Sequence, residues 1–204
     1  MNSKIKVVAI EGPCRAGKST LSSGLIKEYS YHKIDHIVDY AKFAGGGKNI
    51  PPPANSLSLD EEKHALEFFL DIEFERTSHC RKSERIIMDR SVHTLLAHCY
   101  AINNMKQLPY FQLANSCIYS SEKPIWPHKI FYLDVSQEEI HRRNNGKFPQ
   151  DSIFIDTEFN TWIKDYFVNL NIQFPGLVTI LDANLSINEI KLSAKKLLDD
   201  LKWV

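Results

Sequence analysis

The amino-acid sequence predicts an α/β fold of three layers, in which helices cover both faces of a five-stranded parallel sheet. Five short apolar runs alternate with stretches of helical periodicity, a pattern typical of parallel sheets. The runs lack the polar alternation of half-exposed strands, so we expect each strand to be buried on both faces. A glycine-rich turn that ends in lysine directly follows the first run. At 204 residues the chain suits one well-buried domain, and we expect a single domain over residues 1–204.

The first apolar run covers residues 4–10, and a helix is expected over residues 21–29. Between them the sequence matches G-x-x-x-x-G-K-[ST] at every fixed position, and a strand before and a helix after are the setting in which this motif binds phosphates. Glycines let backbone N–H groups turn toward an anion, and the start of the helix adds its partial positive charge. We therefore expect the phosphates of ATP to be bound by Gly12, Pro13, Cys14, Arg15, Ala16, Gly17, Lys18, Ser19 and Thr20.

Two residues of this loop have more specific predicted roles. Lys18 would reach the β- and γ-phosphates of ATP, and the Ser19 hydroxyl would ligate Mg²⁺. The alternative is a turn that contains glycine and ends in Lys-Ser by chance. The strand before the loop and the helix after it favour the phosphate-binding interpretation.

The second apolar run is best defined over residues 34–38 and ends at Asp39. Residues 41–57 contain triple glycine and triple proline, which interrupt helices and central strands. We expect a loop over about residues 39–58 that contacts the phosphoryl acceptor. Asp39 is a candidate for accepting a proton from an acceptor hydroxyl or for holding an acceptor sugar. The alternative is an aspartate that only turns the chain into its loop.

A helix that starts at the capping box Ser58-x-x-Glu61 should follow. Phe69 on this helix is a candidate for stacking on a base, although an aromatic residue at helical spacing is more often part of a core. The third run covers residues 85–89 and ends at Asp89, followed by Arg90. Asp89 could bind Mg²⁺ directly or through water, and Arg90 could bind a phosphate with two hydrogen bonds. The alternative is a structural Asp–Arg ion pair that caps the next helix.

Helices are expected over residues 92–102 and 110–119, and the fourth run covers residues 129–134. A second capping box, Ser136-x-x-Glu139, starts a helix that carries Arg142 and Arg143. Residues 144–156 have the composition of a loop, and we expect a lid over about residues 141–156. Basic residues on a lid would stabilise the charge of a transferring phosphoryl group while water is excluded. The alternative is a solvated basic end of a helix.

The remaining expected elements are a helix over residues 157–169, a fifth strand over 178–182 and a closing helix capped by Ser186. The apolar positions of the closing helix should face the sheet: Ile187, Ile190, Ala194, Leu197, Leu198 and Leu201.

The amino-acid composition limits which partners the protein can bind and in which compartment we expect it. Lys plus Arg and Asp plus Glu both number 25, so no net field attracts nucleic acid or an anionic membrane. No apolar run is of membrane-spanning length, and no signal-peptide pattern precedes the first strand. The four cysteines have neither zinc-site nor C-x-x-C spacing. They suit a reducing cytoplasm, with Cys80, Cys99 and Cys117 buried, and we expect a cytoplasmic protein without histidine-bound metal.

The chain resembles the thymidylate kinase-like branch of the P-loop nucleoside and nucleotide kinases over residues 10–20, 87–91 and 132–135. Those thymidylate kinases read E-G-x-D-R-[AT]-G-K-[ST]-T in the loop, D-R-[YH] after the third strand and Y-L-D-V after the fourth. The related deoxynucleoside kinases have E-R-S where this chain has Asp89-Arg90-Ser91.

This resemblance implies an ATP-dependent phosphotransferase with a P-loop fold and a short lid. It implies that Lys18 and Arg15 stabilise the transferring phosphoryl group, that Asp89 and Ser19 serve Mg²⁺, and that Arg90 binds the acceptor phosphate or sugar. Arg142 and Arg143 would lie at the base of the lid, and adenine would lie near residues 182–184. Because family members are often dimers, a homodimer is an expectation of the same kind.

Two departures from the family pattern concern the acceptor. Cys14 replaces an acidic residue of the loop, and a largely neutral thiol is a weaker hydrogen-bond acceptor than a carboxylate. No Arg-Glu-Pro follows the second strand; Asp39-Tyr40-Ala41 stands there. The ATP side of the pattern is intact, so phosphoryl transfer from ATP is predicted more firmly than its recipient.

The leading hypothesis is an ATP-dependent kinase that moves the γ-phosphoryl group to a nucleoside monophosphate. The alternative acceptors are a nucleoside, a deoxynucleoside or another small metabolite. A different class, an ATP-binding regulator without transfer activity, stays open because of Cys14 and the altered loop. A GTPase switch is disfavoured because no Asn-Lys-x-Asp sequence is present.

Overall fold

The computed structural model describes residues 7–30, 32–46 and 58–203. Its centre is a five-stranded sheet with the order β2-β3-β1-β4-β5, in which every neighbouring pair is parallel. The strands are β1 (Val7–Glu11), β2 (Asp35–Ile37), β3 (Ile86–Asp89), β4 (Lys129–Asp134) and β5 (Val178–Asp182). The predicted fold class is confirmed; four strands lie within the predicted runs, and β1 extends one residue beyond its run, to Glu11.

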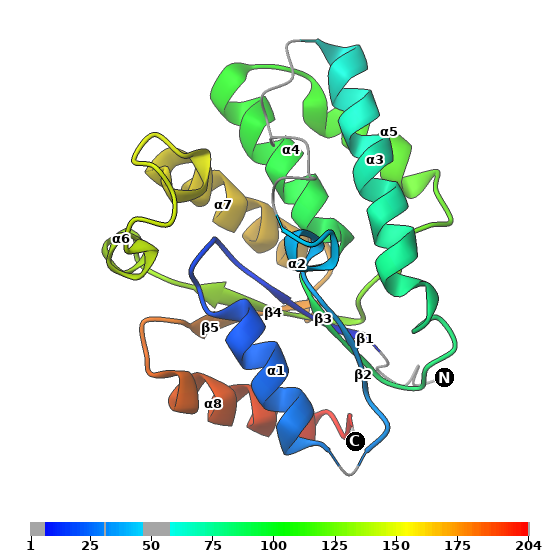
Figure 1. Ribbon diagram of the computed structural model, residues 1–204, viewed down its shortest axis with the longest axis vertical. Coiled ribbons are helices and arrows are strands. Elements are labelled where there is room, and N and C mark those ends of the chain that lie inside the picture. The colour runs from blue at the N-terminus through cyan, green and yellow to red at the C-terminus, as the bar shows by residue number, and fades with distance from the viewer. Residues whose placement is uncertain (1–6, 31, 47–57, 204) are drawn as a thin grey trace.

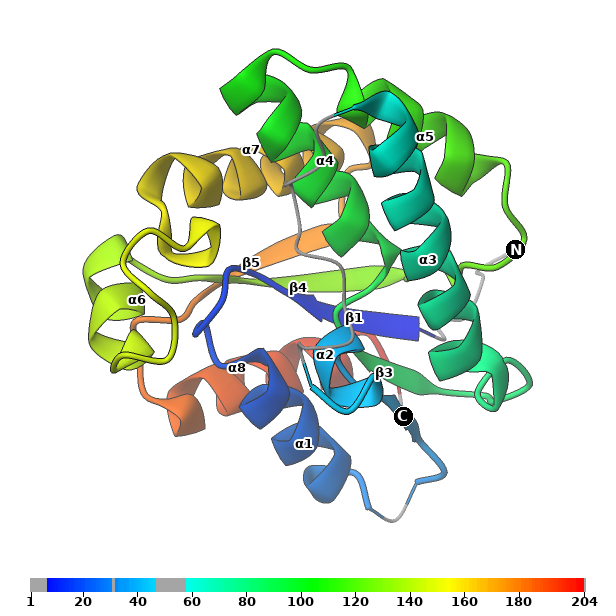
Figure 2. The same ribbon diagram turned by 45° about the horizontal axis from the view of Figure 1, so that its top comes forward.

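Helices cover both faces of the sheet (Figures 1 and 2). One face is covered by α1 (Lys18–Glu28) and α8 (Ile187–Asp200). The other is covered by α3 (Leu59–Ser78), α4 (Val92–Lys106), α5 (Tyr110–Tyr119) and α7 (Thr157–Gln173). Three shorter helices lie toward the carboxyl ends of the strands: α2 (Tyr40–Phe43), α6 (Gln137–Asn144) and η2 (Ile153–Ile155).

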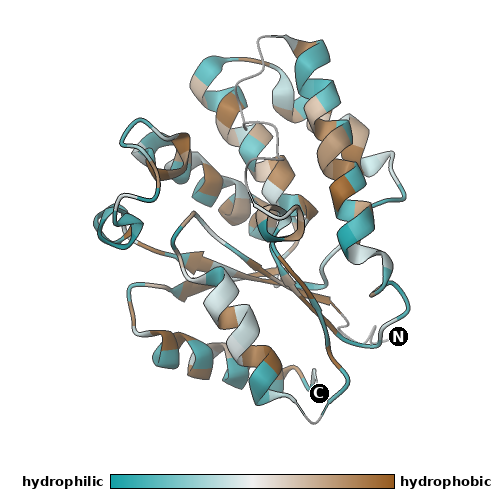
Figure 3. Ribbon diagram, viewed as in Figure 1, coloured by the Kyte–Doolittle hydropathy of each residue, from teal (hydrophilic) through white to brown (hydrophobic). Residues whose placement is uncertain are grey.

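The central strand β1 shows why a continuous apolar run is needed here. Val8 and Ile10 pack into the core beneath α1 and α8, whereas Val7 and Ala9 pack into the core beneath α3, α4 and α7. Successive side chains of a strand point to opposite faces, so a strand covered on both sides must be apolar at every position. Figure 3 shows the apolar colouring concentrated along the strands.

Serine caps place the starts of several helices. The side chains of Ser58, Ser136 and Ser186 accept hydrogen bonds from the backbone N–H of Glu61, Glu139 and Glu189. Ser186 and Glu189 form the reciprocal capping box. At Ser136 the predicted reciprocal contact is replaced, because the Glu139 carboxylate accepts hydrogen bonds from Arg142 and Arg143.

The structure differs from the predictions in three places. The short helix α2, capped by Asp39, lies in a stretch that was expected to be irregular; residues 47–57 of the predicted acceptor loop lie outside the described residues. In α8, Ile190, Ala194 and Leu198 are buried, whereas Ile187 and Leu201 are exposed. Cys117 is half-buried, because its position on α5 does not face the core fully. Within the described ranges, no helix combines the length and apolarity needed to cross a membrane.

Candidate active site

The glycine loop joins β1 to α1 and has the backbone shape that its sequence requires. Gly12 has φ 137°, and a Cβ atom there would lie 2.7 Å from the carbonyl oxygen of Leu133. Gly17 has φ 98°, and Arg15 also has a positive φ, 66°. These conformations favour glycine and turn successive N–H groups toward one side of the loop. The predicted loop is therefore shaped as an anion cradle at the start of α1.

A cleft of about 550 Å³ opens over this loop. Its lining includes the loop residues 14–20 and three side chains from other strand ends or from the lid, namely Asp39, Arg90 and Arg143. Its far end is apolar, formed by Leu185, Ile187 and Ile190. An apolar end beside a phosphate cradle suits a purine ring, and it lies just after the stretch 182–184 that the sequence predicted for adenine.

Two charged side chains of the cleft, Lys18 and Arg15, and one that acts on Lys18 from the end of β3, Asp89, fit a bound nucleoside triphosphate and a cation. The Nζ atom of Lys18 donates a hydrogen bond to the Pro13 carbonyl at 2.7 Å, so its charge is held within the loop. Burial and then the charge of Arg90 lower the pKa of Lys18 to about 8. Arg15 Nε and Asp89 Oδ1 are buried and have no hydrogen-bond partner in the described part of the chain. Such groups are costly unless a ligand completes them, and a phosphate oxygen and a cation are the matching partners.

Arg90 and Asp39 form an ion pair between the ends of β3 and β2, with Arg90 Nε 2.9 Å from Asp39 Oδ2. Arg90 also donates to the Cys14 sulfur at 3.6 Å, and Asp39 Oδ1 accepts from the backbone N–H of Ala41. Burial opposes the charge of Asp39, but Arg90 and Lys18 outweigh it, so the pKa of Asp39 is lowered. The pair therefore carries both charges at neutral pH. The sequence left open a structural ion pair between Asp89 and its neighbour Arg90. In the structure Arg90 instead pairs with Asp39, which is distant in sequence.

A second, much smaller pocket lies on the other side of Cys14 and Arg90, between the glycine loop, α4 and α7. Glu11 forms part of its floor and accepts hydrogen bonds from Ser91 and Thr94. Burial, with the charges of Arg90 and Lys18, lowers the pKa of His98 to about 3, so His98 is neutral. Most of the remaining wall is apolar and includes Phe154, Phe159, Ile163 and Phe167. Its volume of about 10 Å³ leaves room for about one water molecule, so in this structure it is an apolar pocket with polar groups in its lining that is too small for a ring.

The predicted lid contacts the glycine loop through a basic helix end. Arg143 donates to the carbonyl oxygens of Arg15 and Ala16 at 3.4 Å and to that of Ala183 at 2.8 Å. Arg142 is 71% exposed, is paired with Glu139 and does not line the cleft. The Arg15 guanidinium lies over the Phe148 ring, 5.2 Å from its centroid. Asn144 holds the Phe148 backbone with two hydrogen bonds of 2.9 Å.

The carboxyl edge of the sheet thus brings together most of the predicted site residues. The cleft residues include Cys14, Arg15, Ala16, Gly17, Lys18, Ser19, Thr20, Asp39, Arg90 and Arg143. Asp89 lies at the end of β3, opposite Ile10 in the sheet. Phe69 is separate from both pockets and packs against Tyr40, with ring centroids 6.2 Å apart.

Sequence reasoning assigned no role to several residues that the fold places here. Glu11 belongs to the matched family pattern but was given no role, Phe148 was noted only as part of the expected loop, and His98 lies on a helix without any local signal. Arg76, on α3, donates hydrogen bonds to backbone at the ends of β2 and β3. Glu11 was the one with a usable signal, because a carboxylate at the end of a buried strand demands partners.

Comparisons with known proteins agree with this geometry. The family model described as deoxynucleoside kinase matches residues 8–203. A thymidylate kinase of Pediococcus pentosaceus is 22% identical over 211 residues, covering 95% of this chain and 97% of that protein.

Two solved structures share the fold. The thymidylate kinase of Candida albicans superposes with a TM-score of 0.74 at 18% identity, covering 98% of this chain and 93% of the other. A deoxyadenosine kinase from M. mycoides, with dCMP and dCDP bound, has a TM-score of 0.63 at 17% identity, covering 95% and 99%.

Proposed function

The chain belongs to the deoxynucleoside kinase family and is a phosphotransferase, and from this premise we propose that it moves the γ-phosphoryl group of ATP to a sugar hydroxyl of a nucleoside. The observation that carries the choice of acceptor is the Asp39–Arg90 pair on the wall of the cleft. A hydroxyl must lose a proton as it attacks phosphorus, and a positioned carboxylate accepts that proton. Asp39 is ionised and lies beside the phosphate cradle, so it suits this role.

The charges at this end of the cleft disfavour a second phosphate. Arg90 is already matched by Asp39, and Cys14 adds no positive charge. Two like charges about 4 Å apart repel by about 4 kcal/mol at the effective dielectric of a protein surface. The phosphate of a monophosphate acceptor would therefore be repelled by the Asp39 carboxylate, whereas the hydroxyl of a neutral nucleoside could approach Asp39 without this repulsion. The pocket beside neutral His98 carries no charge to oppose a base and sugar, but at about 10 Å³ it has room for about one water molecule, so a nucleoside would enter it only if its walls move apart.

The proposed reaction uses the groups in defined roles. The acceptor oxygen attacks the γ-phosphorus while its proton passes to Asp39, and the bond from the γ-phosphorus to the bridging oxygen breaks, so ADP leaves with the electron pair. Lys18, Arg15 and Arg143 stabilise the negative charge on the phosphoryl oxygens. Mg²⁺, for which Ser19 and the unpaired Asp89 oxygen are suitable ligands, would neutralise further phosphate charge.

A nucleoside monophosphate is the second candidate acceptor, because residues 10–20 and 132–135 follow the pattern of thymidylate kinases and a thymidylate kinase is 22% identical over nearly the whole chain. The third hypothesis is a regulator that binds ATP at the same site but transfers no phosphoryl group to any acceptor. The three hypotheses differ in one measurable quantity, the product formed from each acceptor.

The test is an assay of product formation with Mg²⁺-ATP and a panel of nucleosides and nucleoside monophosphates. We expect ADP and a nucleoside monophosphate to form from at least one nucleoside, and Lys18→Ala to abolish this turnover. In Asp39→Asn, kcat should fall by roughly 10²- to 10⁴-fold while the affinity for ATP is retained.

Asp35→Asn is the matched control, since Asp35 lies at the opposite end of β2 and accepts a hydrogen bond from Ser83. Its kcat should equal that of the wild type. Turnover of monophosphates alone, or full activity of Asp39→Asn, would contradict the proposal.

A further inference from the structure

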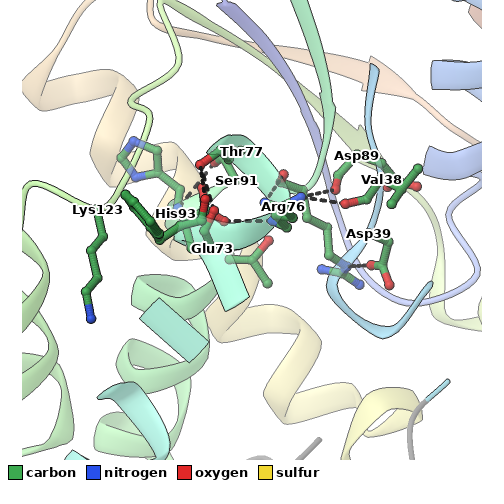
Figure 4. Close-up of polar contacts among 12 residues, drawn as sticks. Val38, Asp39, Glu73, Arg76, Thr77, Asp89, Ser91, His93 and Lys123 are labelled. Carbon is green, nitrogen blue, oxygen red and sulfur yellow. Dashed lines mark hydrogen bonds and ion pairs between the residues drawn. The ribbon is translucent and has the colours of Figure 1, made fainter. Parts of the chain in front are cut away.

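Arg76 lies fully buried beneath the edge of the sheet that carries the Asp39–Arg90 pair (Figure 4). Its guanidinium donates hydrogen bonds to the carbonyl oxygens of Val38 at 2.6 Å, Asp89 at 3.3 Å and Arg90 at 2.7 Å. These carbonyls belong to the backbone at the ends of two neighbouring strands, β2 and β3. One side chain of α3 therefore joins the two segments from which Asp39 and Arg90 project.

The charge of Arg76 is compensated within the core. Its Nε atom lies 2.7 Å from the Glu73 carboxylate, and both side chains have no exposed surface. The guanidinium also lies 3.9 Å from the centroid of the Tyr40 ring, at the start of α2. Burial alone would lower the pKa of Arg76, but Tyr40 and Glu73 outweigh it, and the pKa is raised. A buried ion pair costs several kcal/mol to desolvate and needs additional hydrogen bonds to offset this cost; for Arg76 the carbonyls at the strand ends supply them.

The Arg90 backbone needs such a restraint. Its φ of 66° is in the left-handed region, which costs a non-glycine residue about 1–2 kcal/mol. Two hydrogen bonds hold it there: its N–H donates to the Ile10 carbonyl at 3.0 Å, and its carbonyl accepts from Arg76. If the second were lost, the peptide would relax and the Arg90 side chain would move relative to Asp39.

We propose that Arg76 is a positioning residue for phosphoryl transfer, which fixes the geometry of the Asp39–Arg90 pair by binding the backbone on both sides of it. The inference rests on the proposed function of that pair but not on the identity of the acceptor. The role requires the planar, forked guanidinium of arginine as well as its charge, because the N–H groups must donate to several carbonyls in fixed directions. Lysine retains the charge and cannot reproduce these contacts.

The test compares Arg76→Lys with Arg85→Lys. Arg76 binds the backbone at the carboxyl end of β3, and Arg85 lies at the other end of that strand. Arg85 directly precedes β3, and its Nε atom donates to the Trp203 carbonyl at 2.6 Å. We expect Arg76→Lys to lower kcat by roughly 10- to 100-fold, since a displacement of about 1 Å in a catalytic group costs that much. The KM for ATP should stay within about twofold. Arg85→Lys should lose thermal stability while kcat is unchanged.

A pH profile separates positioning from a general loss of structure. Arg90 and Lys18 are the charged groups that face Asp39 and lower its pKa. When the pair loosens, the pKa of Asp39 rises, so the acid limb of the kcat/KM profile should shift to higher pH in Arg76→Lys and stay in place in Arg85→Lys. An unshifted limb together with an unchanged kcat would overturn the proposal.

Two further measurements keep the inference testable if this variant or the proposed function fails. Glu73→Gln removes the counter-charge and keeps the shape, and it should lower kcat without changing the KM for ATP; wild-type kcat in this variant would contradict us. If no acceptor reacts with the wild type, the proposed function fails separately. A crystal structure of Arg76→Lys then decides: we expect the Asp39–Arg90 contact to open beyond about 3.5 Å, and an unchanged pair would overturn the inference.

Discussion

Lys18 holds a positive charge at a position that is only 6% exposed. Burial and Arg90 lower its pKa to about 8, so in the free protein the ammonium form is complete below this pH and is lost as pH rises through it. ATP is attracted to the protonated form. We therefore expect the affinity for ATP to be constant near pH 7 and to fall by roughly tenfold by pH 9.

Calorimetric titration of ATP across this pH range measures the effect. Lys18→Ala should bind weakly and show no such decline. Cys14→Ser is the control, because Cys14 lines the same cleft, and it should retain the decline. A constant affinity up to pH 9 in the wild type would mean that Lys18 is not perturbed.

The two glycines of the loop should differ in their tolerance of a methyl group. At Gly12 a Cβ atom would lie 2.7 Å from the Leu133 carbonyl, whereas at Gly17 no heavy atom lies within 4 Å. Gly17→Ala therefore carries only backbone strain, about 1–2 kcal/mol. Gly12→Ala adds a steric clash, and we expect a loss of about 3 kcal/mol in the free energy of unfolding. Urea unfolding measures the free energy of unfolding of both variants, and equal losses in Gly12→Ala and Gly17→Ala would contradict this account.

A sequence motif with fixed spacing placed its residues in the cleft, whereas local signals without such a motif did not place Phe69 or Arg142 there. Gly12 and Lys18 belong to a motif whose spacing has a mechanical reason, so their place in the loop could be read directly. Arg76 and Glu73 are three residues apart on a helix, the spacing of an ordinary surface ion pair. Only the tertiary structure shows that this pair is buried and bound to the strand ends.

At the scale of elements, the strands were predictable because burial on both faces demands continuous apolar runs. The predicted range 129–134 matches β4, and 178–182 matches β5. The start of α2 was hidden because Asp39 followed by Tyr40 resembles a turn, and a four-residue helix has no periodicity of its own. The alternation of elements also indicated the edge at which the site would form, since parallel strands carry ligands at their carboxyl ends.

The turn after helix α6 contacts the glycine loop, because the Phe148 ring lies against the Arg15 guanidinium. We expect Phe148→Leu, which keeps an apolar side chain but removes the aromatic face, to lower kcat through Arg15. In a double-mutant cycle with Arg15→Gln, the coupling should be about 0.5–1 kcal/mol.

The chain offers a matched pair for this cycle, because Arg81 lies over the ring of Phe74 at 4.8 Å on another part of the molecule. Phe74→Leu should leave kcat unchanged. Additive effects of Phe148→Leu and Arg15→Gln would show that the lid acts independently of the loop arginine.

At the scale of the whole molecule, two cavities lie on either side of Cys14 and Arg90, and we propose that one takes the donor and the other the acceptor. The cleft over the glycine loop and the pocket between α4 and α7 share Cys14 and Arg90 as a common wall. Membership among the nucleoside and nucleotide kinases was predicted from three short motifs and is confirmed. The contact between Asp39 and Arg90 was not predictable, because it depends on the strand order that places β2 beside β3.

The account depends on a hydroxyl group reacting beside Asp39. A crystal structure with ADP and a nucleoside that the enzyme phosphorylates tests this most directly. We predict a sugar hydroxyl oxygen within about 3 Å of the Asp39 carboxylate, and the pocket lined by His98 widened from its present volume of about 10 Å³ to hold the base. A nucleoside whose hydroxyl lies away from Asp39, or a monophosphate whose phosphate occupies that position, would contradict it.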